Sequence, residues 1–458
     1  MIDTAEEVII KKIAHHSAFF STQITKDIGY RVMQLRKLKT AITQYQDKIE
    51  LALWDDLHKS PEEAYVTEIS IVLSEIEHHI KHLKKWASPK RVATPLHLLP
   101  ASSKILFEPL GTALIVAPWN YPFQLLINSL VGAISAGCCC ILKPSPDAPT
   151  IAKVLEDMIS ENFDSNYISM VQGGRKTNTL LFAQRFDIIF FTGSPKVGKV
   201  VMKAAAENLT PVILELGGKS PCIVDADADI DIAAKRIAWG KLINAGQTCI
   251  APDYLFAHQS IKKELLNKIA KNIKGMYGDT IKQSRFYPRI INEKSVHRLG
   301  GLLKEGKIHT GGEIDVKGKF VAPTIIDDVT PDFLVMQEEI FGPILPVMTF
   351  EDIQEPINYI NKNEKPLAFY YFGKNKKAAA VLAKTSSGGA CINDTLMHIT
   401  NHNLPFGGVG NSGMGNYHGK ESFLAFSHQR AVVTTPTWID IPLKYIPFKY
   451  FKWIQKII

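Results

Sequence analysis

At 458 residues the chain is long enough for two or three domains, and its 46% apolar and 21% charged content is that of an ordinary globular protein. Its 53 basic and 45 acidic residues give a net charge of +8, which is modest for this length and is spread along the chain except at the C-terminal end. This balance argues against a nucleic-acid-binding protein, and the sequence has no uncharged run of about 18 apolar residues that could cross a membrane.

The six cysteines indicate a reducing compartment, so we expect a cytoplasmic protein. Three of them, Cys138 to Cys140, are consecutive, which makes a poor disulfide framework, and no CxxC pairs have the spacing of a zinc site. We therefore expect no bound metal. The first eighteen residues carry several charges and no long apolar core, unlike a secretory signal.

The first ninety residues are predicted to be helical. Ser60-Pro61-Glu62-Glu63 has an N-cap serine, a proline at the first helical position and a glutamate at the third, which is the pattern of a capping box. Apolar residues then recur at helical spacing over 69–83, so one helix face is buried. His78, His79 and His82 on this helix are expected to pack or be solvated rather than to bind metal.

From Lys104 onward, short apolar runs alternate with helical stretches. Strands separated by helices predict parallel βαβ units and a doubly wound sheet, which binds nucleotides at the carboxyl ends of its strands. The predicted strands are Ala113–Ala117, Cys139–Leu142, Ile168–Val171, Asp187–Phe191 and Val212–Leu216, with helices that begin near Tyr121, Ala148, Thr177 and Pro195.

A second βα series begins after Leu216 and continues to about Cys391, with Gly217-Gly218 as the hinge between the two. Its first predicted elements are a strand at Cys222–Val224, a helix at Asp229–Asn244, a strand at Asp253–Ala257 and a helix at Ser260–Lys274. The fold class is therefore α/β, with two doubly wound, Rossmann-like units. Residues 91–103 are irregular and contain prolines, as in an arm or a domain connection.

One stretch, 244–250, presents a single cysteine, Cys249, just after a glycine at the end of a predicted helix. A glycine allows a sharp turn and a close approach to a ligand. A cysteine held beside backbone N–H groups can become a thiolate, which is a strong nucleophile. A lone cysteine is more often a small buried apolar residue, so the stretch alone leaves both interpretations open.

Further candidate groups fall at the ends of predicted strands. Asn120 follows the first strand and offers an amide N–H donor for an oxyanion; Lys143 ends the second and can bond a ribose or a phosphate. Gly193 and Ser194 open a helix where backbone N–H groups and the helix dipole favour a pyrophosphate. Glu215 ends an apolar strand beside two glycines, where desolvation raises a carboxyl pKa toward that of a general base.

Each of these groups also has an ordinary structural interpretation, as a turn residue, a surface lysine or a salt-bridged glutamate. Two later loops complete the set. Glu339 and Phe341 lie in the sequence EEIFGP, and a glycine-rich loop, LPFGGVGNSG, begins at Leu404. A carboxylate and aromatic rings in such loops could hold a ribose and a planar ring. All of these features in one order favour a shared site.

Seven motifs follow one another between about Ile105 and Val432: PWNYP, KPS, FTGS, ELGGKSP, GQTC, EEIFGP and LPFGGVGNSGMG. In this order and spacing they resemble the NAD(P)-dependent aldehyde dehydrogenase superfamily. The segments 251–254, 417–420 and 426–428, with the short N-terminus, are similar to its class 3 branch, which includes fatty aldehyde dehydrogenases. The resemblance implies the aldehyde dehydrogenase fold and oxidation of an aldehyde, of medium or long aliphatic chain or aromatic, to the carboxylic acid.

The resemblance also implies a role for each candidate residue. Cys249 is the nucleophile, Glu215 the base for the thiol and the hydrolytic water, and Asn120 an oxyanion donor together with the backbone N–H of Cys249. Tyr121 and Trp119 are the candidate substrate contacts. The residues implied to hold NAD or NADP are Lys143, Gly193, Ser194, Glu339 and Phe341.

Three questions stay open at this point. Pro146 stands where the family often has a glutamate that repels a 2′-phosphate, so the choice between NAD and NADP is unresolved. The thioester could pass to coenzyme A instead of water, although the base carboxylate at Glu215 favours hydrolysis. A non-catalytic binding protein with the same fold is the other alternative, against which the joint presence of Cys249, Glu215 and Asn120 argues.

The domain boundaries follow from these assignments. We expect an NAD(P)-binding domain over 1–90 and 104–216 and a catalytic domain over 217–405. Bridging arms at 91–103 and 428–440 are implied to form a homodimer. The tail, 441–458, alternates lysines with aromatic residues and is predicted to form a short basic amphipathic helix, which either attaches peripherally to anionic lipid or packs on protein.

Overall fold

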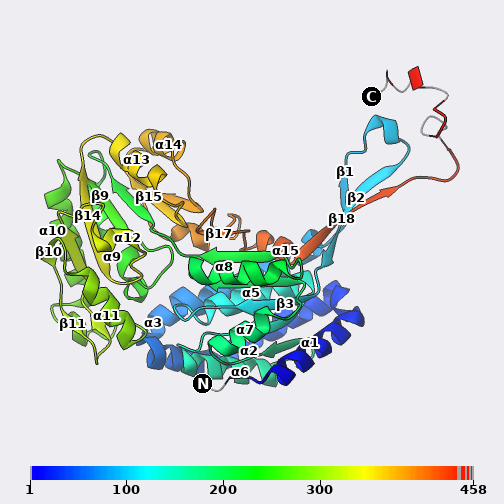
Figure 1. Cartoon of the computed structure of the whole chain (residues 1–458), viewed down its shortest axis with the longest axis horizontal. Helices are drawn as coiled ribbons and strands as arrows, with labels where there is room; N and C mark the ends of the chain where they lie inside the picture. The colour runs from blue at the N-terminus through cyan, green and yellow to red at the C-terminus, as the bar shows by residue number, and fades with distance from the viewer. Residues whose placement is uncertain (1–2, 441–444, 449–450, 453–454, 456–458) are drawn as a thin grey trace.

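The computed structural model describes residues 3–440, 445–448, 451–452 and 455. Two α/β units lie side by side, and a narrow β arm projects away from both (Figure 1). No described helix is long and apolar enough to span a membrane. The predicted tail helix falls largely outside the described residues.

A six-stranded sheet forms the centre of the first unit. Its strands, in sheet order, are β17 (Gly413–Met414), β7 (Val212–Leu216), β6 (Ile188–Gly193), β3 (Thr112–Val116), β4 (Cys139–Lys143) and β5 (Ile168–Met170). All are parallel except β17, which pairs antiparallel with β7. Strands buried on both faces read as continuous apolar runs, so the predicted strand positions agree with the structure to within two residues at each end.

Helices cover both faces of this sheet, as a doubly wound fold requires. One face carries α5 (Gln124–Ala136) and α6 (Pro149–Asn162), with the long α2 (Ile28–Leu57) packed behind them. The other face carries α1 (Glu6–Ser21), α7 (Arg175–Phe182) and α8 (Pro195–Ala206). The carboxyl ends of β3, β4, β6 and β7 therefore meet at one open edge.

The second unit is built on a seven-stranded sheet, parallel except for its edge strand β10. Its strands, in sheet order, are β10 (Lys307–Thr310), β13 (Thr324–Asp327), β14 (Ile344–Phe350), β9 (Tyr254–His258), β8 (Pro221–Val224), β15 (Ala368–Phe372) and β16 (Gly389–Ile392). A small hairpin pairs β11 (Ile314–Asp315) with β12 (Phe320–Val321). The helices of this unit are α9 (Ile230–Leu242), α10 (Lys262–Tyr277), α11 (Glu293–Leu302), α12 (Leu334–Gln337), α13 (Gln354–Lys362) and α14 (Asn375–Leu382).

The arm is a three-stranded antiparallel sheet, in the order β1 (Lys90–Val92), β2 (Ser102–Pro109), β18 (Ser427–Thr434). This differs from the expected irregular segment at 91–103 in two ways. The segment begins with a strand, and residues 104–109, which the predicted boundary places in the nucleotide-binding domain, pair with β18 in the arm. Strand β2 pairs both with the nearby β1 and with the distant β18, and the local sequence does not reveal the distant partner. Helix α15 (Lys420–Ala425) leads into β18.

The N-terminal helix after Ser60 is not continuous. It consists of α3 (Pro61–Ala64), a π-helical turn at Tyr65–Ile69 and α4 (Ser70–Trp86). Such π-turns often occur at functional sites because they re-aim side chains within a helix. The Ser60 hydroxyl accepts from the Glu63 N–H at 3.2 Å, as a capping box requires. The Glu63 carboxylate, however, bonds elsewhere, so only half of the predicted box forms.

Candidate active site

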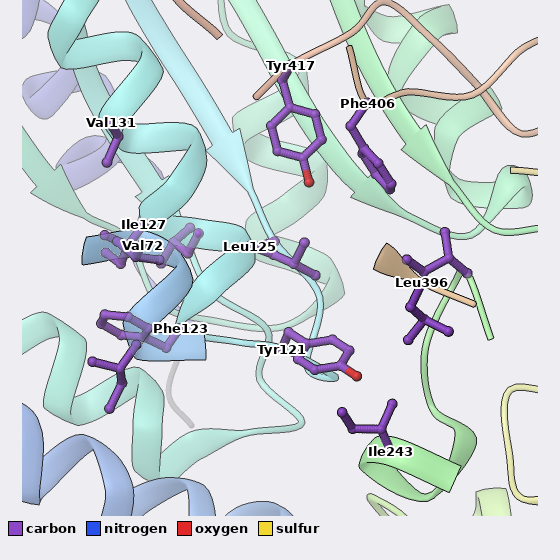
Figure 2. Packing of buried hydrophobic residues seen from close by; sticks show 14 of the residues in the cluster. Val72, Tyr121, Phe123, Leu125, Ile127, Val131, Ile243, Leu396, Phe406 and Tyr417 are labelled. Atoms are coloured by element: carbon purple, nitrogen blue, oxygen red, sulfur yellow. The ribbon is translucent and has the colours of Figure 1, made fainter. Parts of the chain in front are cut away.

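An apolar cavity of about 210 Å³ lies between the two units, and both Cys249 and Glu215 line it. Figure 2 shows five of the residues that line it, arranged around a common space: Tyr121, Tyr417, Phe406, Leu396 and Ile243. The π-turn contributes Val66 and Thr67 to the same lining. The other lining residues are Ile71, Gln124, Leu125, Thr192, Trp239, Thr248, Ile250, Leu367, Met397, Ile399 and Thr400.

Cys249 is half-buried in this cavity and follows a 3₁₀ turn, Ile243–Gly246, at the end of α9. Burial, with the nearby carboxyls of Glu339 and Glu215, raises the pKa of its thiol to about 12, and the backbone N–H groups of Cys249 and Ile250 oppose that rise. The thiol therefore holds its proton in the resting site. It becomes a nucleophile only when a base removes that proton.

Glu215, which lines the same cavity, is the candidate for such a base. It lies on β7, it is buried, and neither of its carboxylate oxygens has a hydrogen-bond partner among the described residues. Burial in this apolar surrounding raises the pKa of the Glu215 carboxyl well above its usual range. A structural glutamate would be paired, because leaving a buried carboxyl without partners costs stability. Its oxygens are therefore free to exchange a proton inside the cavity.

Asn120 follows β3 and is fixed by the nucleophile loop. Its Nδ2 donates to the Gln247 carbonyl at 2.9 Å, and its own carbonyl accepts from Asn244 Nδ2 at 2.7 Å. One hydrogen of Nδ2 remains available, because an amide nitrogen carries two. Asn120 does not line the apolar cavity itself, but these bonds tie it to residues two and five positions before Cys249.

The two predicted substrate contacts separate in the structure. Tyr121 lines the cavity, and its hydroxyl shares a 2.6 Å hydrogen bond with the Thr248 hydroxyl, beside Cys249. Trp119 is not among the residues that line this cavity. Its ring packs edge-to-face on Phe341, with the ring centroids 5.4 Å apart. Tyr121 and Trp119 both adjoin Asn120 in the sequence, but only the Tyr121 side chain lines the cavity.

A larger groove of about 1010 Å³ opens at the carboxyl edge of the first sheet. Lys143, at the end of β4, lines it and is buried, and burial lowers the pKa of its ammonium to about 8. Lys143 Nζ donates to the Pro144 carbonyl at 2.8 Å, which uses one of its three N–H groups. Pro146, Arg175 and Lys196 line the same groove.

The groove also contains the N-terminus of α8. Gly193 and Ser194 line it, and the Ser194 hydroxyl accepts from the Val197 N–H at 3.4 Å. A Cβ at Gly193 would lie 2.6 Å from the Phe191 ring, so only glycine fits at this turn. Thr192, one residue earlier, lines both the groove and the apolar cavity and pairs in register with Glu215. The two spaces therefore meet at Thr192.

Glu339 and Phe341 lie outside the lining of this groove, in the loop that enters β14. Glu339 lines a further hollow of about 550 Å³, and its carboxylate occupies the space above Gly217, where a Cβ would lie 2.1 Å from Oε2. Burial raises the pKa of the Glu339 carboxyl to about 8. Lys219 and Asp253, joined by a 2.5 Å ion pair, support this loop, since Asp253 accepts from the Ile340 N–H and Lys219 donates to the Glu338 carbonyl.

The donors and acceptors of the groove and of the loop that carries Glu339 fit a dinucleotide. A buried ammonium, a glycine turn at the start of a twelve-residue helix and a carboxyl opposite them can bond a ribose, a pyrophosphate and a second ribose. Among the described residues, no group of three or more His, Cys, Asp or Glu side chains could hold a metal ion.

Comparison with known proteins agrees with this geometry. The model of the aldehyde dehydrogenase family matches residues 4–432. The chain belongs to the aldehyde dehydrogenase family. A Staphylococcus aureus protein named 4,4'-diaponeurosporen-aldehyde dehydrogenase is 48% identical over 452 residues, which is 98% of each chain. The rat dimeric NADP-preferring aldehyde dehydrogenase is 47% identical over 413 residues, covering 90% of this chain and 91% of that protein.

Solved structures agree as well. The substrate-bound state of a Staphylococcus aureus enzyme, AldH, superposes with a TM-score of 0.96 at 48% identity, over 98% of this chain and 99% of that chain. The predicted family, its class 3 branch and the aldehyde dehydrogenase fold are thus confirmed. This protein is an NAD(P)-dependent oxidoreductase that acts on aldehydes.

Several residues of this aldehyde dehydrogenase escaped the sequence interpretation. The segment Leu396–Thr400 forms much of the cavity wall but carries no local signal, because it reaches the site only through the fold. Thr192 and Thr248 are adjacent to predicted motifs and could have been found from them. Glu63 was interpreted as half of a capping box, and its carboxylate bonds the nucleophile loop instead.

Proposed function

We propose that Cys249 and Glu215 oxidise long, apolar aldehydes to carboxylic acids in the 210 Å³ cavity. The observation that supports this most strongly is that the Cys249 thiol and the Glu215 carboxyl line one apolar space, next to a groove suited to a dinucleotide. Within the described part of the chain, the Glu215 oxygens have no hydrogen-bond partner. Thr192 connects the two spaces. An aldehyde in the cavity would therefore lie near a bound cofactor.

The first half of the mechanism attaches the substrate. Glu215 takes the thiol proton, and Cys249 Sγ adds to the aldehyde carbon. The resulting oxyanion accepts from the free Nδ2–H of Asn120 and from the backbone N–H of Cys249. Donors of this kind are each worth about 2.7–4 kcal/mol in other enzymes. NAD(P) bound in the groove would supply the hydride acceptor, a positively charged nicotinamide ring.

The second half releases the acid. Loss of the hydride leaves a thioester on Cys249. Glu215 first gives the thiol proton to solvent and then takes a proton from water, whose oxygen attacks the thioester carbonyl. The oxyanion donors act a second time. Collapse of the adduct expels the Cys249 sulfur, which regains a proton, and the carboxylic acid leaves. Lys143, Glu339, Gly193 and Ser194 hold the cofactor, and Phe341 packs against it.

The two alternatives are less well supported. Transfer of the acyl group to coenzyme A would not need the unpartnered Glu215 carboxyl beside Cys249. A non-catalytic binding protein would not need an anion-ready donor at Asn120 in the same place. An absorbance assay at the NAD(P)H band, with a panel of aldehydes, with and without coenzyme A, separates the three: hydrolysis gives NAD(P)H without coenzyme A, acyl transfer requires it, and a binding protein gives none.

The substrate class follows from the cavity wall. Its lining is aliphatic and aromatic on nearly every side, and Val66 and Met397 at the wall are also exposed to solvent, so an apolar chain can extend from the cavity along the surface. The Staphylococcus aureus relative is named for diaponeurosporenal, a long apolar aldehyde. We expect kcat/KM to rise with chain length from hexanal to hexadecanal. Equal values for acetaldehyde and hexadecanal would contradict this class.

The groove favours use of NADP as well as NAD. No carboxylate stands at Pro146, while Arg175 and Lys196 line the same groove and can attract a 2′-phosphate. A named relative prefers NADP. Pro146→Glu should lower kcat/KM for NADP about tenfold relative to NAD, because a carboxylate there would oppose the phosphate; an unchanged ratio would show that this position does not discriminate.

The arm supports a homodimer. It projects from the body, and Val92, Leu96 and Val433 on it are exposed apolar side chains. Similar enzymes are named as dimeric. With the arm as the bridge, 1–90 with 110–216 would form the cofactor domain and 217–405 the catalytic domain. Sedimentation equilibrium should give twice the chain mass of 51.0 kDa, and a monomer would exclude this role for the arm.

The C-terminal segment supports peripheral attachment to anionic lipid. Ile446, Phe448 and Phe451 are exposed apolar residues, and Trp438, just before the tail, is 76% exposed. Apolar and basic residues together favour the surface of an anionic bilayer. Co-sedimentation with phosphatidylserine vesicles should fall when residues 441–458 are removed. Equal pelleting of both forms would favour packing of the tail on protein.

A further inference from the structure

The turn that presents Cys249 has an unusual backbone. Asn244 and Ala245 have φ of 53° and 51°, and Gly246 follows with φ of 75°, so three consecutive residues lie in the left-handed region. Left-handed backbone is unfavourable for a residue with a Cβ, and Ala245 has no polar side chain to offset it. Such a conformation persists only where its surroundings hold it in place.

Most of the hydrogen bonds that hold this turn come from the site itself. Gln247 Nε2 donates to the Asn244 carbonyl at 3.0 Å, and Asn244 Nδ2 donates to the Asn120 carbonyl. Other bonds come from outside: Gln247 Nε2 also donates to the Arg289 carbonyl, and Gln247 Oε1 accepts from the Ile291 N–H. Glu63 Oε1, on α3 of the N-terminal helices, accepts from the Asn244 N–H at 2.7 Å across 181 residues of sequence.

Glu63 lies beside a buried ion pair. Lys59, just before the helix, and Glu68, in its π-turn, are 2.6 Å apart and both fully buried. Glu68 Oε2 accepts from the Phe123 and Gln124 N–H groups, which follow Asn120 and Tyr121. Burial raises the pKa of the Glu63 carboxyl to about 7, and either protonation state leaves an oxygen that accepts from Asn244. One helical segment thus contacts both loops that meet at the site.

We propose that Glu63 is a positioning residue of the reaction, which acts through the Asn244 N–H to hold the strained turn that orients Cys249. The inference deepens the function proposed above and rests on Cys249 as its nucleophile. What Glu63 supplies is an acceptor atom at one place, so a side chain of equal length with an acceptor should replace it, and one without an acceptor should not.

The test compares Glu63→Gln with Glu63→Met, which have similar length and differ in the acceptor. Glu62→Ala is the control, because Glu62 is the preceding residue, is exposed and pairs with Arg285. We expect Glu63→Met to lower kcat about tenfold to a hundredfold with KM nearly unchanged, since small misplacement of reacting groups has effects of this size. Glu63→Gln and Glu62→Ala should stay within about threefold of the wild type.

Alkylation by iodoacetamide, followed peptide by peptide, provides a readout that does not need turnover. In Glu63→Met the rate at Cys249 should change while the rate at Cys391, the other half-buried cysteine, stays constant. General loosening of the fold would instead speed alkylation of the buried cysteines 138–140 as well. That result, or equal loss in the Gln and Met variants, would overturn the proposal.

A second change distinguishes strain from lost packing. Glycine adopts positive φ without a Cβ penalty, so adding Ala245→Gly to Glu63→Met should recover most of the lost kcat and the Cys249 alkylation rate. If Glu63→Met alone does not fold, the double variant is compared with Ala245→Gly; no recovery of folding or activity contradicts the proposal. If the wild type oxidises no aldehyde, the proposed function fails, while the alkylation comparison still decides the role of Glu63.

Discussion

The two parallel sheets contribute to the site from opposite ends. In the first sheet, Asn120, Lys143, Ser194 and Glu215 all lie at or just beyond the carboxyl ends of strands, which is where doubly wound sheets bind ligands. In the second sheet, the loops that carry Cys249 and Glu339 enter strands instead of leaving them, whereas the cavity-wall segment Leu396–Thr400 follows β16. Cys249 precedes β9 and Glu339 precedes β14. The second sheet therefore meets the first with its amino edge.

This difference explains why the first sheet is suited to bind the cofactor and the second sheet to present the nucleophile. The carboxyl edge of the first sheet offers backbone N–H groups and a helix N-terminus, which suit phosphates. The loops that enter the second sheet do not form a helix N-terminus of this kind. One of them instead carries the strained turn before Cys249, which faces the carboxyl edge of the first sheet. The four substitutions that follow test the two edges separately, beginning with the nucleophile.

Cys249→Ala should have the largest effect. Loss of the sulfur removes the bond on which both half-reactions depend, so NAD(P)H production should fall by at least about 10⁴-fold, as for nucleophiles elsewhere. Cofactor affinity, measured by fluorescence titration, should stay the same because the groove belongs to the other sheet. Cys391→Ala serves as the control. Appreciable turnover in Cys249→Ala would show that Cys249, at the second sheet, is not the nucleophile.

Glu215→Gln tests the base on the first sheet. General-base catalysis is worth about 10²–10⁴-fold, and hydrolysis of the thioester depends on it fully. We expect the steady-state rate to fall within this range while a single turnover still releases NAD(P)H, so that a burst precedes a slow phase. If the burst rate and the steady-state rate of Glu215→Gln both equal those of the wild type, another group is the base. Glu338→Gln, an exposed glutamate, controls for charge.

Asn120→Ala tests the donor that the first sheet aims at the second. Removing one oxyanion donor costs about 10²–10³-fold in kcat. KM for the aldehyde should change little, because the charge that Asn120 stabilises forms only after addition. A large rise in KM with constant kcat would instead make Asn120 a ground-state contact.

Most of the first sheet could be predicted from the sequence because its strands are buried on both faces and appear as uninterrupted apolar runs. The same rule located Asn120, Lys143, Ser194 and Glu215, since it says where ligands bind relative to those strands. Cys249 and Glu339 lie before strands, so the rule does not find them. Their roles came from the glycine turn and from the resemblance to a family.

What could not be predicted depends on contacts between distant segments. The arm strand Ser102–Pro109 pairs with Ser427–Thr434, more than 300 residues away. The segment Leu396–Thr400 becomes part of the cavity wall only because the fold brings it to the other lining residues. Glu63 shows the limit most clearly. Its local pattern predicts a capping box, and the first half forms, but its carboxylate makes a bond that no local pattern encodes.

The smallest effect concerns the cofactor edge of the first sheet and depends on pH. Burial lowers the pKa of Lys143 to about 8, so the charged form that attracts the cofactor prevails below that pH and is lost above it. Because only about a tenth of such groups remains charged at pH 9, KM for the cofactor should rise up to about tenfold between pH 7 and 9. In Lys143→Arg, whose guanidinium stays charged, KM should be nearly constant over the same range. An equal rise in both forms would mean that another group, and not the buried ammonium at the end of β4, controls cofactor affinity.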